Sequence, residues 1–426
     1  MNRAELFRYA GLEVGDDVLV GHYELDGRHF SEEVTFENTG SLRRPAVVAV
    51  AELWYLLAGL SYFKAGAPSR IDLGTTPVGM NARALLEAAV HDGLGEFSFR
   101  NNLPLDDVVV TGGREALSSA PALTTKKVLI PFGGGIDSVV TTESLAHLER
   151  SLFIMSPASG RFAPLEATAA VSQLDVVRAT RRLDPQILRG DENFFNGHVP
   201  VTAMVTMLAA VAALASGHAA VAMSNEHSAS APNLRWRNRD INHQWSKSWA
   251  AEGLIADALA ERVGPEFVVA SYLRDRSELW VAQRFAQFPS YHHVFRSCNR
   301  AFTQDLGERA PAWCGVCDKC LFINLVLAPF IERGVLRDIF AGEPLADARL
   351  DHSLRSLIGL GLSHKPFECV GDPDESAVAL RFVSELPAWR DQTRLAELAR
   401  LASPDRDFTE LLQPQGSSRV PSHWLR

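Results

Sequence analysis

The sequence predicts an α/β protein built around a doubly wound parallel sheet. From residue 126 onward, short apolar segments alternate with longer segments of helical periodicity, as in a parallel sheet covered by helices. The first apolar segment runs directly into three glycines and the start of a helix. Period-two alternation is frequent before residue 120, and helical periodicity dominates after residue 290. We therefore expect a β-rich α+β module before the sheet and a helical region after it.

The length and charge of the chain limit its organisation and its partners. With 426 residues, the chain can form two or three domains. We expect a module over residues 1–120, a sheet domain over 124–290, and a cysteine-cluster and helical region over 291–426. The 42 basic and 51 acidic side chains give a net charge of −9, which argues against nucleic acid as a partner. Since we find no signal core and no run of 18 apolar residues, we expect a cytoplasmic protein without membrane insertion.

The N-terminal module should contain a hairpin, a buried helix and two further short strands. Residues 21–37 alternate around Asp26-Gly27, a strong signal for a β-hairpin. Residues 46–66 are apolar on most sides and predict a buried helix ending at Gly66. Alternation at residues 96–100 and 108–110 predicts two more strands. Residues 118–122 form a Ser/Ala/Pro-rich linker. No chemistry is predicted for this module; recognition of a substrate or simple packing would be its role.

The central and C-terminal elements follow from periodicity. Strands are expected near residues 126–132, 151–156, 174–180, 219–224 and 266–271, and helices over 199–216 and 245–263. Further helices are expected over residues 321–332, 335–340, 350–360, 375–386 and 394–402. In a doubly wound sheet, ligands bind beyond the carboxyl ends of the strands, where the strand order reverses. The loops after residues 132, 156 and 223 should therefore meet at one crevice.

The glycine loop after the first central strand predicts a phosphate site. Gly133, Gly134 and Gly135 allow consecutive backbone N–H groups to point at one spot, and Asp137 and Ser138 follow them. The helix that begins there adds the positive end of its dipole. The loop lacks both the Lys-Ser/Thr end of a Walker loop and the GxGxxG spacing of a dinucleotide site. The alternative is a plain glycine-rich turn.

Polar segments elsewhere supply further candidate site residues. One segment follows an apolar strand, where metal-coordinating and proton-transferring groups fit. A second contains arginines interleaved with Trp, suited to phosphates or a carboxylate. A third precedes a helix, where backbone donors are free. The alternatives are helix caps, a solvated face and structural histidines. The candidates are Asn225, Glu226 and His227; Arg235, Arg237, Arg239, His243 and Lys247; His198; and His293.

Four of the five cysteines predict a metal site. Cys298, Cys314, Cys317 and Cys320 have the spacing C-x15-C-x2-C-x2-C, and Cys369 lies elsewhere. Four thiolates suit a closed tetrahedral zinc site, which is normally structural. Unliganded thiols and an iron–sulfur cluster are the alternatives.

These motifs resemble known families. The glycine loop resembles the SGGxDS loop of the PP-loop ATP pyrophosphatases, which have a HUP-like fold, with Gly133 where Ser is usual. Together with the cysteines, it is similar to the 7-cyano-7-deazaguanine synthases, which activate a carboxylate with ATP and carry a four-cysteine zinc site. A closer resemblance covers the whole chain. The family is that of the UDP-N-acetyl-α-D-muramoyl-L-alanyl-L-glutamate epimerases of peptidoglycan precursor synthesis, and the segments are PFGGGIDS, NGHVPVTA, SNEHSAS, NHQWSKS, HHVFRSCNRAF, WCGVCDKCLF and KPFECVG.

The resemblance implies an ATP-dependent inversion of the terminal L-Glu of UDP-MurNAc-L-Ala-L-Glu to D-Glu. A carboxyl adenylate would make the α-proton removable, and AMP and pyrophosphate would be released. The glycine loop, Asp137 and Mg²⁺ would hold the pyrophosphate, and Ser138 would touch a phosphate. The candidates for proton transfer are Glu226, His227, His243 and His293. The alternatives are another PP-loop carboxylate-activating ligase, resembling a 7-cyano-7-deazaguanine synthase or modifying tRNA, and a non-catalytic adenine-nucleotide sensor.

Overall fold

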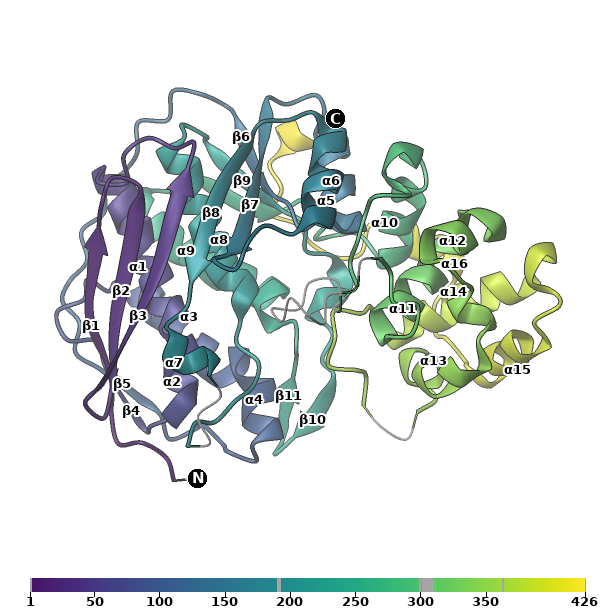
Figure 1. Cartoon of the computed structure of the whole chain (residues 1–426), viewed down its shortest axis with the longest axis horizontal. Helices are drawn as coiled ribbons and strands as arrows, with labels where there is room; N and C mark the ends of the chain where they lie inside the picture. Colours follow the sequence, from purple (N-terminus) through teal and green to yellow (C-terminus); the bar gives the residue numbers. More distant parts are fainter. Residues whose placement is uncertain are drawn as a thin grey trace.

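One sheet of ten strands organises the described part of the chain in this computed structural model (Figure 1). The structure describes residues 2–189, 193–298, 300, 310, 312–361 and 364–425. Asn299, Ala301 and Phe302, which belong to one of the segments quoted above, lie outside these residues. The strand order is β12-β9-β6-β7-β8-β3-β2-β1-β4-β5. The α/β class expected from the sequence is confirmed.

The parallel half of the sheet contains the five strands expected from the sequence. Their bounds are β6 (Val128–Pro131), β7 (Arg150–Pro157), β8 (Val176–Arg182), β9 (Ala220–Met223) and β12 (Val268–Ser271). Neighbours in the order β12-β9-β6-β7-β8 all pair in parallel. From β6 the chain steps through β7 to β8 on one side, and from β9 it steps to β12 on the other. The strand order therefore reverses between β6 and β9, where a ligand crevice is expected.

The N-terminal strands extend the same sheet. β1 (Phe7–Val14), β2 (Val18–Leu25) and β3 (Arg28–Glu37) form an antiparallel meander. β3 pairs antiparallel with β8, and β4 (Arg70–Asp72) and β5 (Val109–Thr111) follow β1 in parallel. The expected hairpin is confirmed, and both turn residues have positive φ, 47° at Asp26 and 78° at Gly27. The sequence boundary at residue 120 thus does not separate two sheets.

Helices cover both faces of the sheet. One face carries α1 (Pro45–Ala58), α2 (Leu60–Gly66), α3 (Met80–Ala88), α8 (Val201–Ala215) and α9 (Trp249–Val263); the other carries α5 (Ile136–Ser144), α6 (Ala163–Ser172) and α10 (Glu278–Phe285). Successive strand residues enter opposite cores. In β6, Leu129 belongs to the first core, whereas Val128 and Ile130 belong to the second. This alternation explains why the central strands are apolar on both faces.

The segment Pro45–Gly66 is long and apolar enough to cross a membrane, but it is a core element here. Within its most apolar window, 89% is buried inside the protein. α1 and α2 lie under the meander and beside α8 and α9. A helix surrounded by protein is apolar all round for the same reason as one surrounded by lipid. The predicted end at Gly66 is confirmed.

The expected strand at residues 96–100 is wrong, because this segment forms α4 (Gly95–Arg100). Alternation over five residues is too short to decide between strand and helix. The ion pair between Arg100 Nε and Glu96 Oε1, at 2.6 Å, has the i,i+4 spacing of a helix. Phe97 is fully buried and packs edge-on against Phe195. The helix brings Glu96 towards the candidate site described below.

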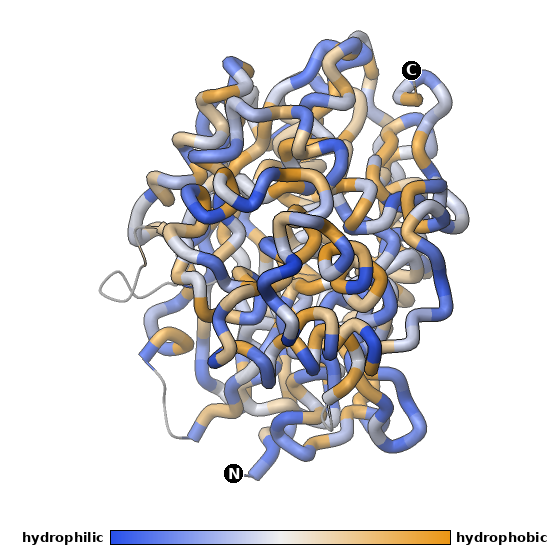
Figure 2. The backbone as a smooth tube through the Cα atoms, turned by 90° about the vertical axis from the view of Figure 1, so that its right-hand side faces the viewer, coloured by the Kyte–Doolittle hydropathy of each residue, from blue (hydrophilic) through white to orange (hydrophobic). Residues whose placement is uncertain are grey.

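The C-terminal helices form a lobe beside α10, on the side away from β1–β5 (Figure 1). They are α11 (Asp318–Leu327), α12 (Arg333–Phe340), α13 (Asp351–Leu357), α14 (Pro373–Glu385), α15 (Thr393–Leu401) and α16 (Phe408–Leu411). The five helices expected in this region are confirmed, with shifted ends. Two smaller features lie outside these groups. They are the short helix α7 (Pro185–Leu188) and a hairpin formed by β10 (Leu234–Trp236) and β11 (Arg239–Ile241). In Figure 2, hydrophilic residues concentrate along the outer turns and hydrophobic stretches lie inside.

Candidate functional site

The glycine loop lies at the carboxyl end of β6, next to the reversal of strand order. Gly134 has φ +74°, a conformation that L side chains rarely adopt, and Gly135 is the N-cap of α5. A Cβ on Gly135 would lie 2.5 Å from Ser297 Oγ, whereas a Cβ on Gly133 would meet no atom within 4 Å. The missing hydroxyl at Gly133 is therefore not a steric requirement. Ser138 Oγ donates to Gly135 O at 3.1 Å and stabilises the turn.

Two carboxylates, Asp137 on α5 and Glu226 in the loop after β9, lie close enough for their charges to interact. Burial and the nearby charge of Glu226 raise the pKa of Asp137 to about 6, although Lys319 and Lys247 oppose the shift. Asp137 Oδ1 is buried and has no hydrogen-bond partner in the described part of the chain. Asn225, which precedes Glu226, donates from Nδ2 to Ser271 Oγ at 3.0 Å. This bond joins the ends of β9 and β12.

A buried arginine fixes the loops that carry two of the charged groups. Arg274 is 1% exposed and pairs with Glu252, with 2.7 Å between Nη2 and Oε2. Its Nη1 donates to the backbone oxygen of Glu226 at 3.0 Å, and its Nη2 donates to that of Lys247 at 2.6 Å. Charge-assisted hydrogen bonds of this kind are about twice as strong as neutral ones. Arg274 therefore holds Glu226 and Lys247 on the same side of the sheet.

Cys369 lies between two cationic side chains from another part of the chain. Lys247 Nζ lies 3.5 Å from Cys369 Sγ, and the His243 side chain is hydrogen-bonded to the same sulfur. Burial raises the pKa of Cys369, but the charge of Lys247 and the bond to His243 outweigh burial and lower the pKa to about 6. The thiolate is thus the main form near neutral pH.

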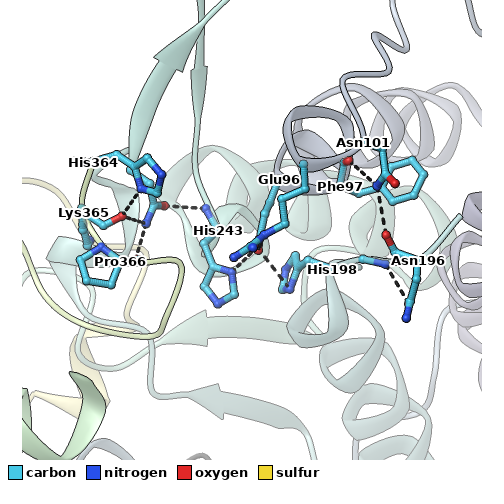
Figure 3. A network of polar contacts seen from close by, with 12 residues as sticks. Glu96, Phe97, Asn101, Asn196, His198, His243, His364, Lys365 and Pro366 are labelled. Atoms are coloured by element: carbon cyan, nitrogen blue, oxygen red, sulfur yellow. Dashed lines mark hydrogen bonds and ion pairs between the residues drawn. The ribbon is translucent and has the colours of Figure 1, made fainter. Parts of the chain in front are cut away.

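Glu96 holds His243 from the opposite side (Figure 3). His243 Nδ1 lies 2.5 Å from Glu96 Oε2, and the His198 ring packs against the His243 ring with 4.4 Å between centroids. Burial lowers the pKa of His243, but the hydrogen bonds to Cys369 and Glu96 raise it to about 9. Burial, followed by the charge of His243, lowers the pKa of His198 to about 4. We therefore describe His243 as a cation between a carboxylate and a thiolate.

Glu96, His198 and His243 also have the spacing of metal ligands, with their ligand atoms within 4.8 Å of one another. Metal binding requires a neutral imidazole, because a protonated ring has no free lone pair. The raised pKa of His243 therefore favours a proton at this position over a metal ion.

Two further buried lysines complete the charged cluster. Lys319, at the start of α11, donates from Nζ to the backbone oxygen of Cys369. Lys365 is 6% exposed, and its Nζ has no hydrogen-bond partner in the described residues. Burial lowers the pKa of Lys365, and Asp372, Glu226, Glu278 and Cys369 oppose the shift. The backbone oxygens of Lys365 and Pro366 accept hydrogen bonds from Asn233 Nδ2 at 3.4 and 2.7 Å. Asn233 thus ties the Cys369 loop to the hairpin region.

The four predicted metal ligands converge at the start of α11. Their sulfur atoms all lie within 4.8 Å of one another, and Cys317–Cys320 and Cys314–Cys320 are separated by 3.4 and 3.6 Å. Zinc–sulfur bonds of about 2.3 Å in a tetrahedron require sulfur separations of about 3.8 Å, so the group can bind one metal ion. The cluster joins α11 to the segment ending at Cys298, whose Arg296 N donates to Gly134 O at 3.0 Å. A metal bound by these cysteines would hold Cys298 in place and, through the bond of Arg296 to Gly134, the glycine loop as well.

The predicted arginines lie on the β10–β11 hairpin. Arg235 is exposed and donates to Asn238 Oδ1 at 2.9 Å, and exposed Arg237 stacks over the Trp236 ring at 4.8 Å. Arg239 differs, because Asp92 and Asp106 already pair with it. Rings connect the hairpin to the cluster: Trp236 contacts Phe99, Phe99 contacts Phe367, and Phe367 lies near His243.

Two protein-family models together match most of the chain. The MurL N-terminal domain family matches residues 1–272, and the MurL C-terminal domain family matches residues 294–410. The chain belongs to the MurL family. No solved structure matches it significantly.

Three curated proteins of the MurL family are similar to nearly the whole chain. A Micromonospora protein is 41% identical, over 95% of this chain and 93% of its own length. One from Salinispora tropica is 40% identical, over 94% and 90%, and one from Xanthomonas oryzae pv. oryzae is 35% identical, over 90% and 86%. Each is named UDP-N-acetyl-α-D-muramoyl-L-alanyl-L-glutamate epimerase.

This MurL-family chain brings together most, but not all, of the residues predicted for the site. The charged cluster contains Asp137, which follows the glycine loop, and Glu226, Lys247, His243 and His198. His227 is exposed, and Gly416 of the C-terminal segment lies close to its ring. His293 is exposed as well. Neither side chain has a described bond to the cluster.

Sequence reasoning missed five residues of the cluster. Cys369 is the odd cysteine in the sequence, although it lies with Lys365 in the KPFECVG segment. Lys319 stands between two predicted metal ligands, whose spacing points to the sulfur atoms alone. Glu96 falls in the segment that was predicted as a strand. Glu278 begins α10, and burial, followed by Glu226 and Asp137, raises its pKa well above the usual range.

Proposed function

We propose that this protein is an ATP-dependent epimerase that inverts the terminal L-Glu of UDP-MurNAc-L-Ala-L-Glu to D-Glu. The observation that carries the proposal is the shared name of the three relatives, which align with nearly the whole chain. The nucleotide-sugar dipeptide named for the relatives is the proposed substrate here, with no nucleic-acid partner. Because ATP and nucleotide sugars are cytoplasmic metabolites, we place the activity in the cytoplasm.

The proposed chemistry starts with activation of the glutamate carboxylate. An α-proton is hard to remove beside an anionic carboxylate, because the resulting carbanion adds a second negative charge. Transfer of AMP to the carboxylate gives a mixed anhydride whose acyl group carries no negative charge, and releases pyrophosphate. Proton removal and return on the opposite face then invert the carbon, and water releases AMP and the D-Glu product. ATP hydrolysis would pull the epimerisation forward.

The residues of the crevice fit ATP and Mg²⁺. The free backbone N–H groups at the start of α5 suit the pyrophosphate. Asp137 Oδ1 is buried without a partner among the described residues, as expected of a carboxylate oxygen that binds a cation, and Asp137 would hold Mg²⁺. The ion would offset the charge of the leaving pyrophosphate. This set of roles supports the resemblance to the PP-loop enzymes and their HUP-like fold.

Four converging sulfur atoms favour structural zinc. A closed set of four thiolates leaves no open position for a substrate, which is typical of structural zinc sites. Cys298, Cys314, Cys317 and Cys320 would hold the ion and join α11 to the segment that packs on the glycine loop. Zinc would thereby position Lys319 and support the phosphate site without taking part in the reaction.

Further residues fit the substrate. Arg235 and Arg237 are exposed on the hairpin and suit its diphosphate or second carboxylate, while Arg239 is already paired with two aspartates. Among the predicted proton-transfer groups, Glu226 and His243 belong to the charged cluster, whereas His227 and His293 are exposed. We therefore favour Glu226 and His243 for proton transfer.

The decisive experiment is incubation of the protein with the L-Glu precursor, ATP and Mg²⁺ in D₂O. We expect AMP, pyrophosphate and a D-Glu product with deuterium on the α-carbon. ADP and phosphate, or a product of unchanged configuration, would contradict the proposal. Asp137→Ala should abolish AMP formation while the protein stays folded. An Asp137→Ala variant that processes ATP like the parent would count against any ATP-dependent activity of this loop.

A further inference from the structure

Cys369 lies among buried, positively charged side chains. The roles proposed so far do not use this cysteine. Its sulfur contacts Lys247 Nζ at 3.5 Å and the His243 side chain, and its backbone oxygen accepts from Lys319. Lys365, four residues earlier, has a buried Nζ with no hydrogen-bond partner in the described part of the chain. An unpaired buried ammonium is costly unless an anionic group binds there. The cluster therefore combines a thiol with a buried cation that has no hydrogen-bond partner among the described residues.

The arrangement of Glu96, His243 and Cys369 follows the logic of a catalytic relay. A carboxylate orients an imidazole, and the imidazole is hydrogen-bonded to a sulfur atom (Figure 3 shows the first pair). His243 Nδ1 lies 2.5 Å from Glu96 Oε2, and both Glu96 and Cys369 raise the pKa of the ring, so His243 is poorly suited to accept a further proton at neutral pH. The acceptor in this trio is the sulfur.

We propose that the Cys369 thiolate removes the α-proton of the activated glutamate. This inference rests on the proposed function, because it assigns the proton acceptor of that reaction. The Cα–H bond breaks, an S–H bond forms at Cys369, and the electron pair moves into the enolate of the acyl adenylate. A second, protonated group returns a proton to the opposite face. The Cys369 sulfhydryl then releases its proton to water, and the second group takes up a proton from water, which restores both groups.

The charges around Cys369 suit both stages of this step. The cations Lys247, His243, Lys319 and Lys365 interact with Cys369, and the carboxylates Asp137 and Glu226 belong to the same charged cluster. Before the step, the cations stabilise the thiolate. During the step, negative charge moves from the sulfur to the enolate, and cations already in place stabilise it there at no cost in reorganisation.

The acid strength of the thiol also fits the task. A general base works best when its pKa lies near the working pH, and the lowered pKa of Cys369, about 6, meets this condition. His243, with its pKa raised to about 9, is already protonated at neutral pH. Thiolates are large, polarisable and weakly solvated, so little solvation is lost when one approaches a carbon-bound proton.

The test separates activation from proton transfer in Cys369→Ser and Cys369→Ala. Wild-type protein must first show exchange of labelled pyrophosphate into ATP and α-deuteration of the product in D₂O; failure here contradicts the proposed function itself. In both variants we expect pyrophosphate exchange to persist within about threefold and α-deuteration to fall at least about 100-fold. Epimerisation within about tenfold of wild type in either variant would overturn the inference.

Two measurements on wild-type protein complete the test. Iodoacetamide should modify Cys369 selectively in the zinc-loaded protein, and the substrate should protect it. The modified protein should keep pyrophosphate exchange and lose α-deuteration, which decides the question even if the variants fail to fold. Persisting α-deuteration after full modification would overturn the inference. A substrate adduct on Cys369 that hydroxylamine cleaves would also overturn it, because the sulfur would then be a nucleophile forming a thioester.

Discussion

Replacing Lys247 with Met should shift the titration of Cys369 by a measurable amount. The Nζ–Sγ distance of 3.5 Å gives a Coulomb energy between about 1 kcal/mol at the dielectric constant of water and about 5 kcal/mol at an effective value near 20. Since 1.36 kcal/mol corresponds to one pKa unit, the pKa of Cys369 should rise from about 6 by about 1 to 3 units. At pH 7, the thiolate fraction would fall from about 0.9 to about 0.5 or less.

The assay is the pH dependence of iodoacetamide modification, followed at Cys369 by mass spectrometry from pH 5 to 10. The midpoint of the profile should lie near pH 6 in the wild type and above about pH 7 in Lys247→Met. Lys127→Met is the matched control, because Lys127 pairs with Glu149 at the opposite end of β6. A midpoint in Lys247→Met within about 0.3 unit of the control would refute the view that this ammonium sustains the thiolate.

Three further expectations concern the metal, the glycine loop and pH. Cys317→Ser should reduce bound zinc from about one per chain to near zero by metal analysis and lower the melting temperature; unchanged zinc would contradict the assignment. Gly133→Ser should keep pyrophosphate exchange within about threefold and leave the melting temperature unchanged, because a Cβ at this position meets open space. Gly134→Ala should lower the melting temperature, because φ is +74° there; equal melting temperatures in the two variants would contradict this view. The raised pKa of His243, about 9, stabilises the fold below about pH 6.5 and is lost as pH rises through 9. The lowered pKa of Cys369, about 6, stabilises it above about pH 9 and is lost as pH falls through 6. The two slopes oppose each other between pH 6.5 and 9 in the wild type. Cys369→Ser keeps only the part of the His243 shift that comes from Glu96, so urea unfolding should show that this variant loses stability with rising pH relative to wild type; parallel profiles would contradict the pairing.

The sequence predicted those parts of the fold whose signals are local. The five parallel strands are continuous apolar runs followed by polar loops, and their order along the chain places Gly133 and Asn225 at neighbouring strand ends. The cysteine spacing is also local, which is why the four sulfur atoms were predicted as one group. The segment at residues 96–100 shows the limit, because a five-residue alternation was outweighed by the packing of Phe97 in the core.

Local sequence patterns could not predict contacts between segments that lie far apart in the chain. Glu96, His243 and Cys369 come from α4, the loop after β11 and the loop before α14, and no single stretch reveals that they meet. Lys247, which lies beside Cys369, is held through its backbone by Arg274, which follows β12. The KPFECVG segment carried part of the signal, because it was one of the segments on which the family resemblance rested.

The pairing of β3 with β8 also affects how the chain folds during synthesis. Glu33–Glu37 lies against Arg178–Arg182, so the free edge of the meander stays uncovered until residue 182 has left the ribosome. An uncovered strand edge can pair with another chain. Partners distant in sequence also close slowly, because the intervening loop must first be ordered. The buried ion pair between Glu32 and Arg181 joins the two halves when they meet. Nascent chains interrupted before β8 would therefore be the aggregation-prone species of this protein.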